Sequence, residues 1–136
     1  TLDYDFDMEK MLKFEGQTGP YLQYTGVRIA SILRGNPYDA NNLDVSLFDD
    51  ATYFELSRTI GEFKSIVAKA CSEDAPSVVA KYLLGLAQTF NKFYANVKIN
   101  ASDEKVRNTN FMIAHATRIV INEGLRLLGI EYVEQM

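Results

Sequence analysis

The sequence has almost none of the side chains that metal sites, disulfides and activated thiols require. Its 136 residues include one cysteine, Cys71, one histidine, His115, and no tryptophan. A single cysteine cannot form an internal disulfide, which fits a reducing compartment. Because one histidine and one distant cysteine cannot build a zinc site, we expect no metal site. We expect His115 to have a structural or solvent-facing role and Cys71 to be a small buried residue.

Charge and hydropathy exclude two further classes of protein. The formal net charge is −4, which argues against broad, non-specific binding of nucleic acid. No apolar run approaches the roughly 20 residues of a membrane span, and no signal-peptide pattern opens the chain. We therefore expect no membrane partner and a cytoplasmic location. Thr1 is not an initiator methionine, so we also expect a fragment of a longer polypeptide.

Apolar residues recur every three or four positions along most of the chain, which predicts an all-α bundle of about five helices. The longest predicted helices cover about 77–97, with an inward stripe of Val79, Leu83, Leu86, Phe90 and Phe93, and about 104–128, capped by Asp103. In the second helix Val106, Ile113, Val120 and Leu127 repeat every seven residues, with Asn110, Thr117 and Gly124 near the same seam. Gly124 should allow close approach of another helix. We expect an extended segment at 1–7 and a connection at 35–50 that Leu43, Val45 and Leu47 pin to the bundle. The shorter predicted helices cover about 7–14, capped by Asp7; 51–60, capped by Asp49 or Asp50; and 63–71.

The most informative stretch is FEGQTGPYLQYTGVRIASILR, residues 14–34. We predict a glycine-containing loop followed by a helix that has Gly19 at its N-cap, Pro20 in its first turn and Gly35 at its end. At helical spacing, Tyr21, Tyr24 and Arg28 share a face away from the core face that contains Leu22, Gly26, Ile29 and Leu33. An aromatic and basic face can stack on a flat partner and pair with an anion. Spacing alone, however, favours a second packing layer with a solvated arginine.

The run FEGQTGPYLQYTGVRIASIL closely resembles the stretch of arginyl-tRNA synthetases in which the catalytic domain meets a C-terminal helical domain. That family usually reads FEGxTGPYLQYxHARI there. The stretch KYLLGLAQTFNKFY and the ending IEYVEQM also resemble the family, although residues 36–75 match poorly. Gly26 stands at the position of the usual histidine, and Gln135 at that of the usual arginine.

The resemblance implies that residues 1–15 are the end of a catalytic domain with a junction helix, and that residues 16–136 are an anticodon-binding domain of the DALR type. The parent would be an arginine–tRNA ligase that uses ATP and arginine, with arginine tRNA and the catalytic domain as partners. The HIGH-like and KMSK-like motifs of class I synthetases are absent from this sequence. We therefore expect these 136 residues to have no catalytic residue and no cofactor of their own, and to act as a monomer.

The resemblance also assigns residues to an anticodon site, where unpaired bases are read by stacking and hydrogen bonding. It matches Tyr24 and Arg28 to residues that face the anticodon loop, and Tyr94 to a second aromatic contact. Met136 matches a methionine near that loop, and Lys98 matches a position that could contact phosphate. Gly16 and Gln17 match a loop that moves on tRNA binding. Two alternatives stay open. One is a helical scaffold or protein-interaction module whose tyrosines are buried, and the other is a DALR-type domain of a cysteinyl or glycyl synthetase.

Overall fold

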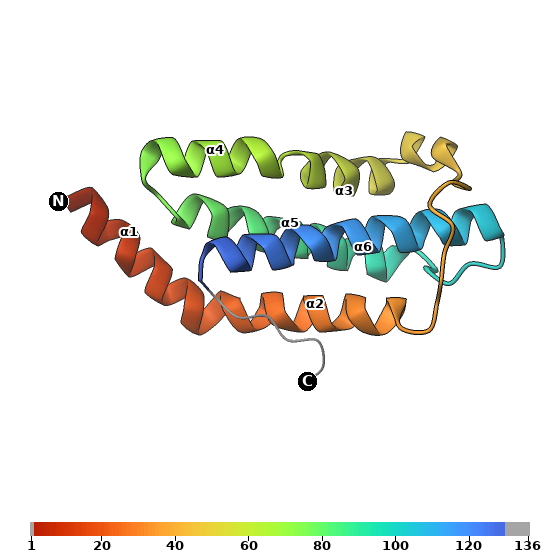
Figure 1. The fold of residues 1–136 in the computed structure, drawn as a ribbon, viewed down its shortest axis with the longest axis horizontal. Helices are drawn as coiled ribbons and strands as arrows, with labels where there is room; N and C mark the ends of the chain where they lie inside the picture. Colours follow the sequence, from red (N-terminus) through yellow and green to blue (C-terminus); the bar gives the residue numbers. More distant parts are fainter. Residues whose placement is uncertain (1, 130–136) are drawn as a thin grey trace.

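The structure of the protein is a computed structural model that describes residues 2–129, with side chains from residue 7 onward. The described residues form six α-helices and no strand, which confirms the predicted all-α bundle (Figure 1). The elements are α1 (Leu2–Lys13), the π-helical turn η1 (Phe14–Thr18), α2 (Gly19–Leu33), the 3-10 helix η2 (Val45–Asp49), α3 (Ala51–Gly61), α4 (Phe63–Glu73), α5 (Ser77–Asn96) and α6 (Glu104–Leu127).

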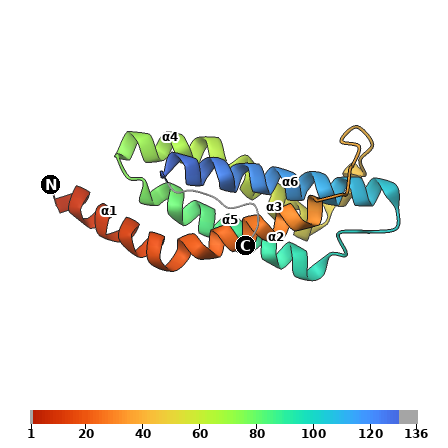
Figure 2. The same cartoon turned by 60° about the horizontal axis from the view of Figure 1, so that its bottom comes forward.

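Helix α5 lies at the centre of the bundle and packs against α2, α3, α4 and α6. Helices α3 and α4 run end to end along one side of the α5–α6 pair, and α2 runs along the other side (Figure 1). Figure 2 shows α2 crossing α5 at an angle. The predicted inward residues of α5 are all buried: Val79, Leu83, Leu86, Phe90 and Phe93. Because α5 buries this much apolar surface, it fixes the positions of the helices that pack against it.

Local signals at the helix ends behave as the sequence predicts. The Asp50 carboxylate accepts a hydrogen bond from the Thr52 N–H at 2.8 Å, so Asp50 is the N-cap of α3. Asp103 caps α6 in the same way through the Val106 N–H at 3.0 Å. Gly35 and Gly129 follow α2 and α6 with φ of 74° and 76°, a conformation that glycine adopts without strain.

The prediction of an extended segment at residues 1–7 is wrong, because α1 begins at Leu2. Asp7 lies inside this helix rather than at its cap, and its carboxylate accepts a hydrogen bond from the Ser77 hydroxyl at the start of α5. An apolar–acidic alternation over seven residues is too short to distinguish a strand from a helix. The segment contains no glycine or proline, and acidic residues near a helix N-terminus interact favourably with its dipole.

The predicted loop at Gly16 and Gln17 is also wrong, because both residues lie in the π-helical turn η1. The chain is therefore helical from Leu2 to Leu33, and α1 leaves the direction of α2 at an angle (Figure 1). The Gly19 N–H donates to the Phe14 carbonyl five residues earlier, so Gly19 begins α2 instead of capping it. Pro20 has no N–H, and its ring crowds the carbonyl four residues before it. A wider π-turn accommodates that proline without ending the helix.

Hydrogen bonds fasten the connection between α2 and α3 to α6, and apolar side chains of the connection, Leu47 among them, pack against the core. The Asp39 N–H donates to Asn108 Oδ1 at 3.2 Å, and the Asp44 N–H donates to Thr109 Oγ1 at 2.8 Å. Asn108 Nδ2 donates back to the Asn42 carbonyl at 3.0 Å. Val45, predicted to pin this connection, is 73% exposed. Leu47 packs against the core as predicted. The α6 side chains that bind the connection were not predicted, because they lie more than 60 positions away in the sequence.

Two burial predictions are wrong for a related reason. Cys71 is exposed on the outer side of α4, since Ala70 occupies the inward position at that end. In the predicted stripe of α6, Ile113 is buried and so are Asn110, Thr117 and Gly124, whereas the last apolar member, Leu127, is 47% exposed. Spacing identifies neighbouring stripes on a helix, but the rotation that selects between them is set by the facing helices.

Gly124 lets α6 approach α5 closely, as predicted. A Cβ added there would lie 2.6 Å from Leu83 Cδ2, and Leu83 is completely buried. Gly124→Ala should therefore lower the free energy of unfolding by about 1–3 kcal/mol, because the core must move to admit a methyl group. Urea unfolding followed by circular dichroism measures this change. The matched control is Gly85→Ala in α5, where no heavy atom lies within 4 Å of the added Cβ.

The control should be neutral or raise stability by up to about 1 kcal/mol, because alanine has the higher helix propensity. Equal effects of the two substitutions would contradict the close contact between α5 and α6.

Candidate functional site

Two exposed tyrosines and one arginine meet where α2 crosses the end of α5. The Arg28 guanidinium carbon lies 4.5 Å from the ring centroid of Tyr94 and 5.2 Å from that of Tyr24. Arg28 Nη2 also donates to the Tyr24 hydroxyl at 3.3 Å. Tyr24 and Arg28 are one helical turn apart on α2, whereas Tyr94 comes from α5. We call these three residues the Arg28 cluster.

Asn91 on α5 holds the Arg28 cluster in place from below. Its Oδ1 accepts a hydrogen bond from Arg28 Nη1 at 2.9 Å, and its Nδ2 donates to the Tyr21 hydroxyl at 2.7 Å and to Thr25 Oγ1 at 3.2 Å. One amide thus satisfies three side chains of α2, and it fixes the arginine on one edge while the opposite edge faces outward. The sequence analysis missed Asn91. Its position three residues before Tyr94 was the available signal in the sequence, but only the fold shows that this side of α5 faces α2.

The exposure of the tyrosines separates the two interpretations of the Tyr21–Tyr24–Arg28 face. Tyr24 is 50% exposed and Tyr94 is 41% exposed, whereas Tyr21 is partly buried against the core. A purely structural packing layer would bury all three rings. The exposed pair gives the surface two aromatic faces with a guanidinium between them, an arrangement that can stack on flat rings and donate hydrogen bonds to anions or base edges.

A cavity of about 430 Å³ lies on another side of Tyr94, between the C-terminal ends of α2 and α5 and the N-terminal half of α6. It combines apolar walls with polar side chains at its edge, and its lining residues are Ser31, Ile32, Asn36, Tyr94, Val97, Ile99, Asn100 and Phe111. The ring of Tyr94 packs against buried Phe90 with 6.3 Å between centroids. The inner part of Tyr94 is therefore anchored, while its outer part remains accessible.

The other predicted site residues make none of the contacts within the Arg28 cluster that the structure describes, or lie outside the described residues. Lys98 is exposed in the segment after α5, and its carbonyl accepts a hydrogen bond from Asn110 Nδ2 at 3.3 Å. Gly16 and Gln17 lie in η1, two or more helical turns before Arg28. Met136 lies outside the residues that the structure describes.

His115 has a structural partner. Its Nδ1 lies 2.6 Å from the hydroxyl of Tyr38, and burial raises the pKa of the Tyr38 phenol. This contact ties the connection after α2 to the middle of α6, in keeping with the predicted structural role. Among the described residues, no group of three or more histidine, cysteine or acidic side chains is placed to hold a metal ion. None of the helices in the described part of the chain is long and apolar enough to cross a membrane.

Comparison with known proteins places this arrangement in a family. Residues 22–136 match the DALR anticodon binding domain family. The arginine–tRNA ligase of Lactococcus lactis subsp. lactis is 44% identical over 135 residues, which cover 98% of this chain and 24% of that protein. The ligase of Lactobacillus johnsonii is 42% identical over 134 residues, with the same coverage of both chains. The chain thus spans about a quarter of the length of the curated relatives it matches.

A solved structure agrees with these relatives. Thermus thermophilus arginyl-tRNA synthetase superposes with a TM-score of 0.79 at 31% sequence identity. The superposition covers 94% of this chain and 23% of that one.

The contact between Arg28 and Tyr94 should be measurable in the free protein. A double-mutant cycle of Arg28→Ala and Tyr94→Ala, followed by urea unfolding, should give a favourable coupling of about 0.5–1 kcal/mol, as expected for a partly exposed cation–π pair. The control cycle combines Tyr94→Ala with Arg126→Ala, whose guanidinium binds Glu123 within α6. That cycle should be additive, and an equally additive Arg28–Tyr94 cycle would contradict the contact.

Proposed function

This chain belongs to the DALR anticodon binding domain family, and from that premise we propose that it binds the anticodon loop of an arginine tRNA through the Arg28 cluster. The observation that carries this proposal is the guanidinium of Arg28 held between two half-exposed tyrosine rings. The names of the most similar relatives support arginine as the amino acid of the tRNA.

The chemistry of the Arg28 cluster suits an RNA loop. Specific RNA recognition usually targets unpaired bases that can be splayed out, stacked on aromatic rings and hydrogen-bonded on their edges. Tyr24 and Tyr94 offer the stacking faces. Arg28 has five N–H donors, of which one binds Asn91 and one binds Tyr24, so three are left for a base edge or a phosphate.

The acidic balance of the chain is compatible with this mode of binding. Stacking contributes about 1–3 kcal/mol per base and needs no net positive charge. At physiological ionic strength the Debye length is about 8 Å, so distant carboxylates are screened from the Arg28 cluster. A local arginine with two aromatic rings can therefore bind RNA on a protein whose net charge is −4.

The wider role of the chain is part of the same proposal. We infer that it works within a cytoplasmic, monomeric ligase that joins arginine to tRNA using ATP, with the chemistry carried by a catalytic domain. Residues 1–15 would join that domain, and residues 16–136 would form the anticodon-binding domain, with the boundary inside η1. Gly16, Gln17, Lys98 and Met136 would contact or approach the RNA in addition to the Arg28 cluster.

The test is a titration of this chain with an anticodon stem-loop of arginine type and with the same RNA carrying a changed middle anticodon base. The unchanged protein should prefer the cognate loop. Tyr94→Ala and Arg28→Ala should each weaken cognate binding about 10-fold, because a stack or a hydrogen-bonded charge is lost. Lys64→Ala, which removes an exposed cation of α4 that lies outside both the Arg28 cluster and its neighbours, is the control and should bind normally.

Equal affinity of the unchanged protein for both loops, or full binding by the two cluster variants, would contradict the assignment of anticodon reading to the Arg28 cluster.

A further inference from the structure

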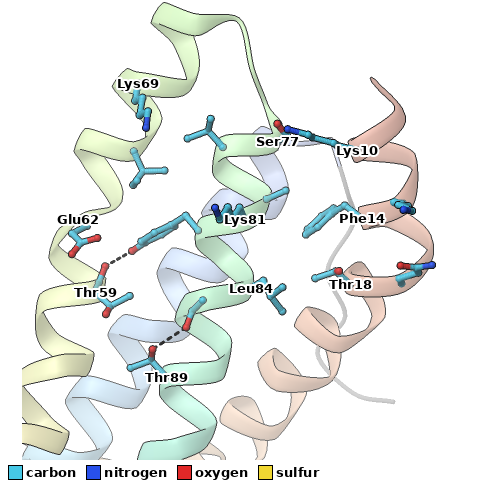
Figure 3. A pocket seen from close by; sticks show the side chains of 17 residues that line it. Lys10, Phe14, Thr18, Thr59, Glu62, Lys69, Ser77, Lys81, Leu84 and Thr89 are labelled. Carbon is cyan, nitrogen blue, oxygen red and sulfur yellow. Dashed lines mark hydrogen bonds between the residues drawn. The ribbon is translucent and has the colours of Figure 1, made fainter. Parts of the chain in front are cut away.

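A basic trough lies across the N-terminal half of α5, with a volume of about 900 Å³. Helix α5 forms its floor, α1 and η1 form one wall, and α3 and α4 form the other (Figure 3). Four lysines line it: Lys10 and Lys13 from α1, Lys69 from α4 and Lys81 from α5. Among the described lining residues only Glu62 is acidic, and its carboxylate pairs with Arg58. The trough therefore concentrates positive charge on an acidic chain.

Four hydroxyl groups of the trough are occupied by internal hydrogen bonds. Thr59 and Thr89 donate to backbone carbonyls of their own helices, and the Tyr82 hydroxyl donates to the Thr59 carbonyl at 2.5 Å. The Ser77 hydroxyl donates to Asp7. All four lysines are exposed, so their ammonium groups reach solvent. A molecule that binds in the trough would therefore interact mainly with the charged lysine side chains.

The trough offers charge without stacking. Its two aromatic residues, Phe14 and Tyr82, are only 7% and 8% exposed, and their rings form part of the core. A flat base would find no open ring face here. Lysine ammonium groups act as point charges that suit phosphate oxygens, whereas base reading requires planar or aromatic partners. The chemistry fits a phosphodiester backbone.

One continuous helical segment links the trough to the Arg28 cluster. Lys10, Lys13 and Gln17 line the trough, and Tyr21, Tyr24 and Arg28 follow them at the same spacing of three or four residues. The last three all take part in the contacts with Asn91 or within the Arg28 cluster. At 1.5 Å per residue, the 18 residue steps from Lys10 to Arg28 follow about 27 Å of helix, and the bend between α1 and α2 makes the direct distance shorter (Figure 1). At about 3.4 Å per base pair, this length corresponds to at most roughly eight base pairs of a stem attached to the loop.

We propose that this trough binds the phosphodiester backbone of the same RNA whose loop contacts the Arg28 cluster. The inference rests on the proposed function and extends it from the loop to the adjoining stem. Lys13 and Lys81 on facing elements neutralise phosphates, and this contribution is independent of base sequence. The Arg28 cluster determines which RNA binds, while the trough adds affinity and orients the stem.

The experiment compares the unchanged chain with the double variant Lys13→Gln/Lys81→Gln, titrated with the anticodon stem-loop over a range of salt concentrations. Affinity at low salt should fall about 5- to 20-fold, and by the same factor for the cognate loop and for the loop with a changed middle base. The slope of log K against log salt should become shallower by about 1–2, or roughly 0.7–0.9 for each lost phosphate contact.

The matched control is Lys64→Gln/Lys105→Gln, which removes the same charge from exposed lysines outside the trough. Thermal unfolding should give the same midpoint for all three proteins. Trough and control variants with the same affinity and salt slope would overturn this inference, including the case in which the trough instead binds an acidic peptide. A change in base preference rather than in overall affinity would also overturn it.

Failure of the proposed function has a different signature. The unchanged chain would then show no preference for the cognate loop, whatever the trough variants do.

Discussion

The burial of one face of α5 is the constraint on which both surfaces depend. Phe90 and Phe93 are completely buried, so they fix the rotation of the helix about its axis. With that rotation set, Asn91 faces α2, Tyr94 reaches the surface beside Arg28, and Lys81 faces the solvent. The Arg28 cluster and the basic trough are thus two consequences of one packed helix. A change that rotated α5 would displace both.

Helix α6 supplies a second kind of constraint, through buried polar side chains. Asn108, Thr109 and Asn110 are buried in succession and bind the connection after α2, the segment after α5 and Tyr53 of α3. Buried polar groups destabilise a fold unless they find partners, so such contacts select one arrangement of the chain over others. Burial also raises the pKa of the Tyr53 phenol, which keeps it a neutral donor to Asn110.

The charge distribution explains how an acidic chain can have locally basic surfaces. The trough gathers four of the 14 basic residues, and Arg28 adds another in the cluster. Over distances beyond the Debye length of about 8 Å, the acidic remainder has little effect on an approaching phosphate. Net charge therefore limits non-specific binding, while local geometry governs the contacts proposed for the loop and the stem.

Spacing and capping rules in the sequence by themselves determined the helical bundle, the buried stripe of α5, the starts of α3 and α6 at Asp50 and Asp103, and the close approach at Gly124. The resemblance to arginyl-tRNA synthetases identified the family and selected Tyr24, Arg28 and Tyr94. These features depend on residues within one or two helical turns, or on a motif read directly from the chain.

Only the tertiary structure revealed Asn91 beneath Arg28, the partnership of Tyr38 with His115, the exposure of Cys71 and the four lysines of the trough. Asn91 and Arg28 are 63 positions apart, and Tyr38 and His115 are 77 apart. Contacts of that range depend on how helices cross and rotate against one another, which local sequence rules do not specify.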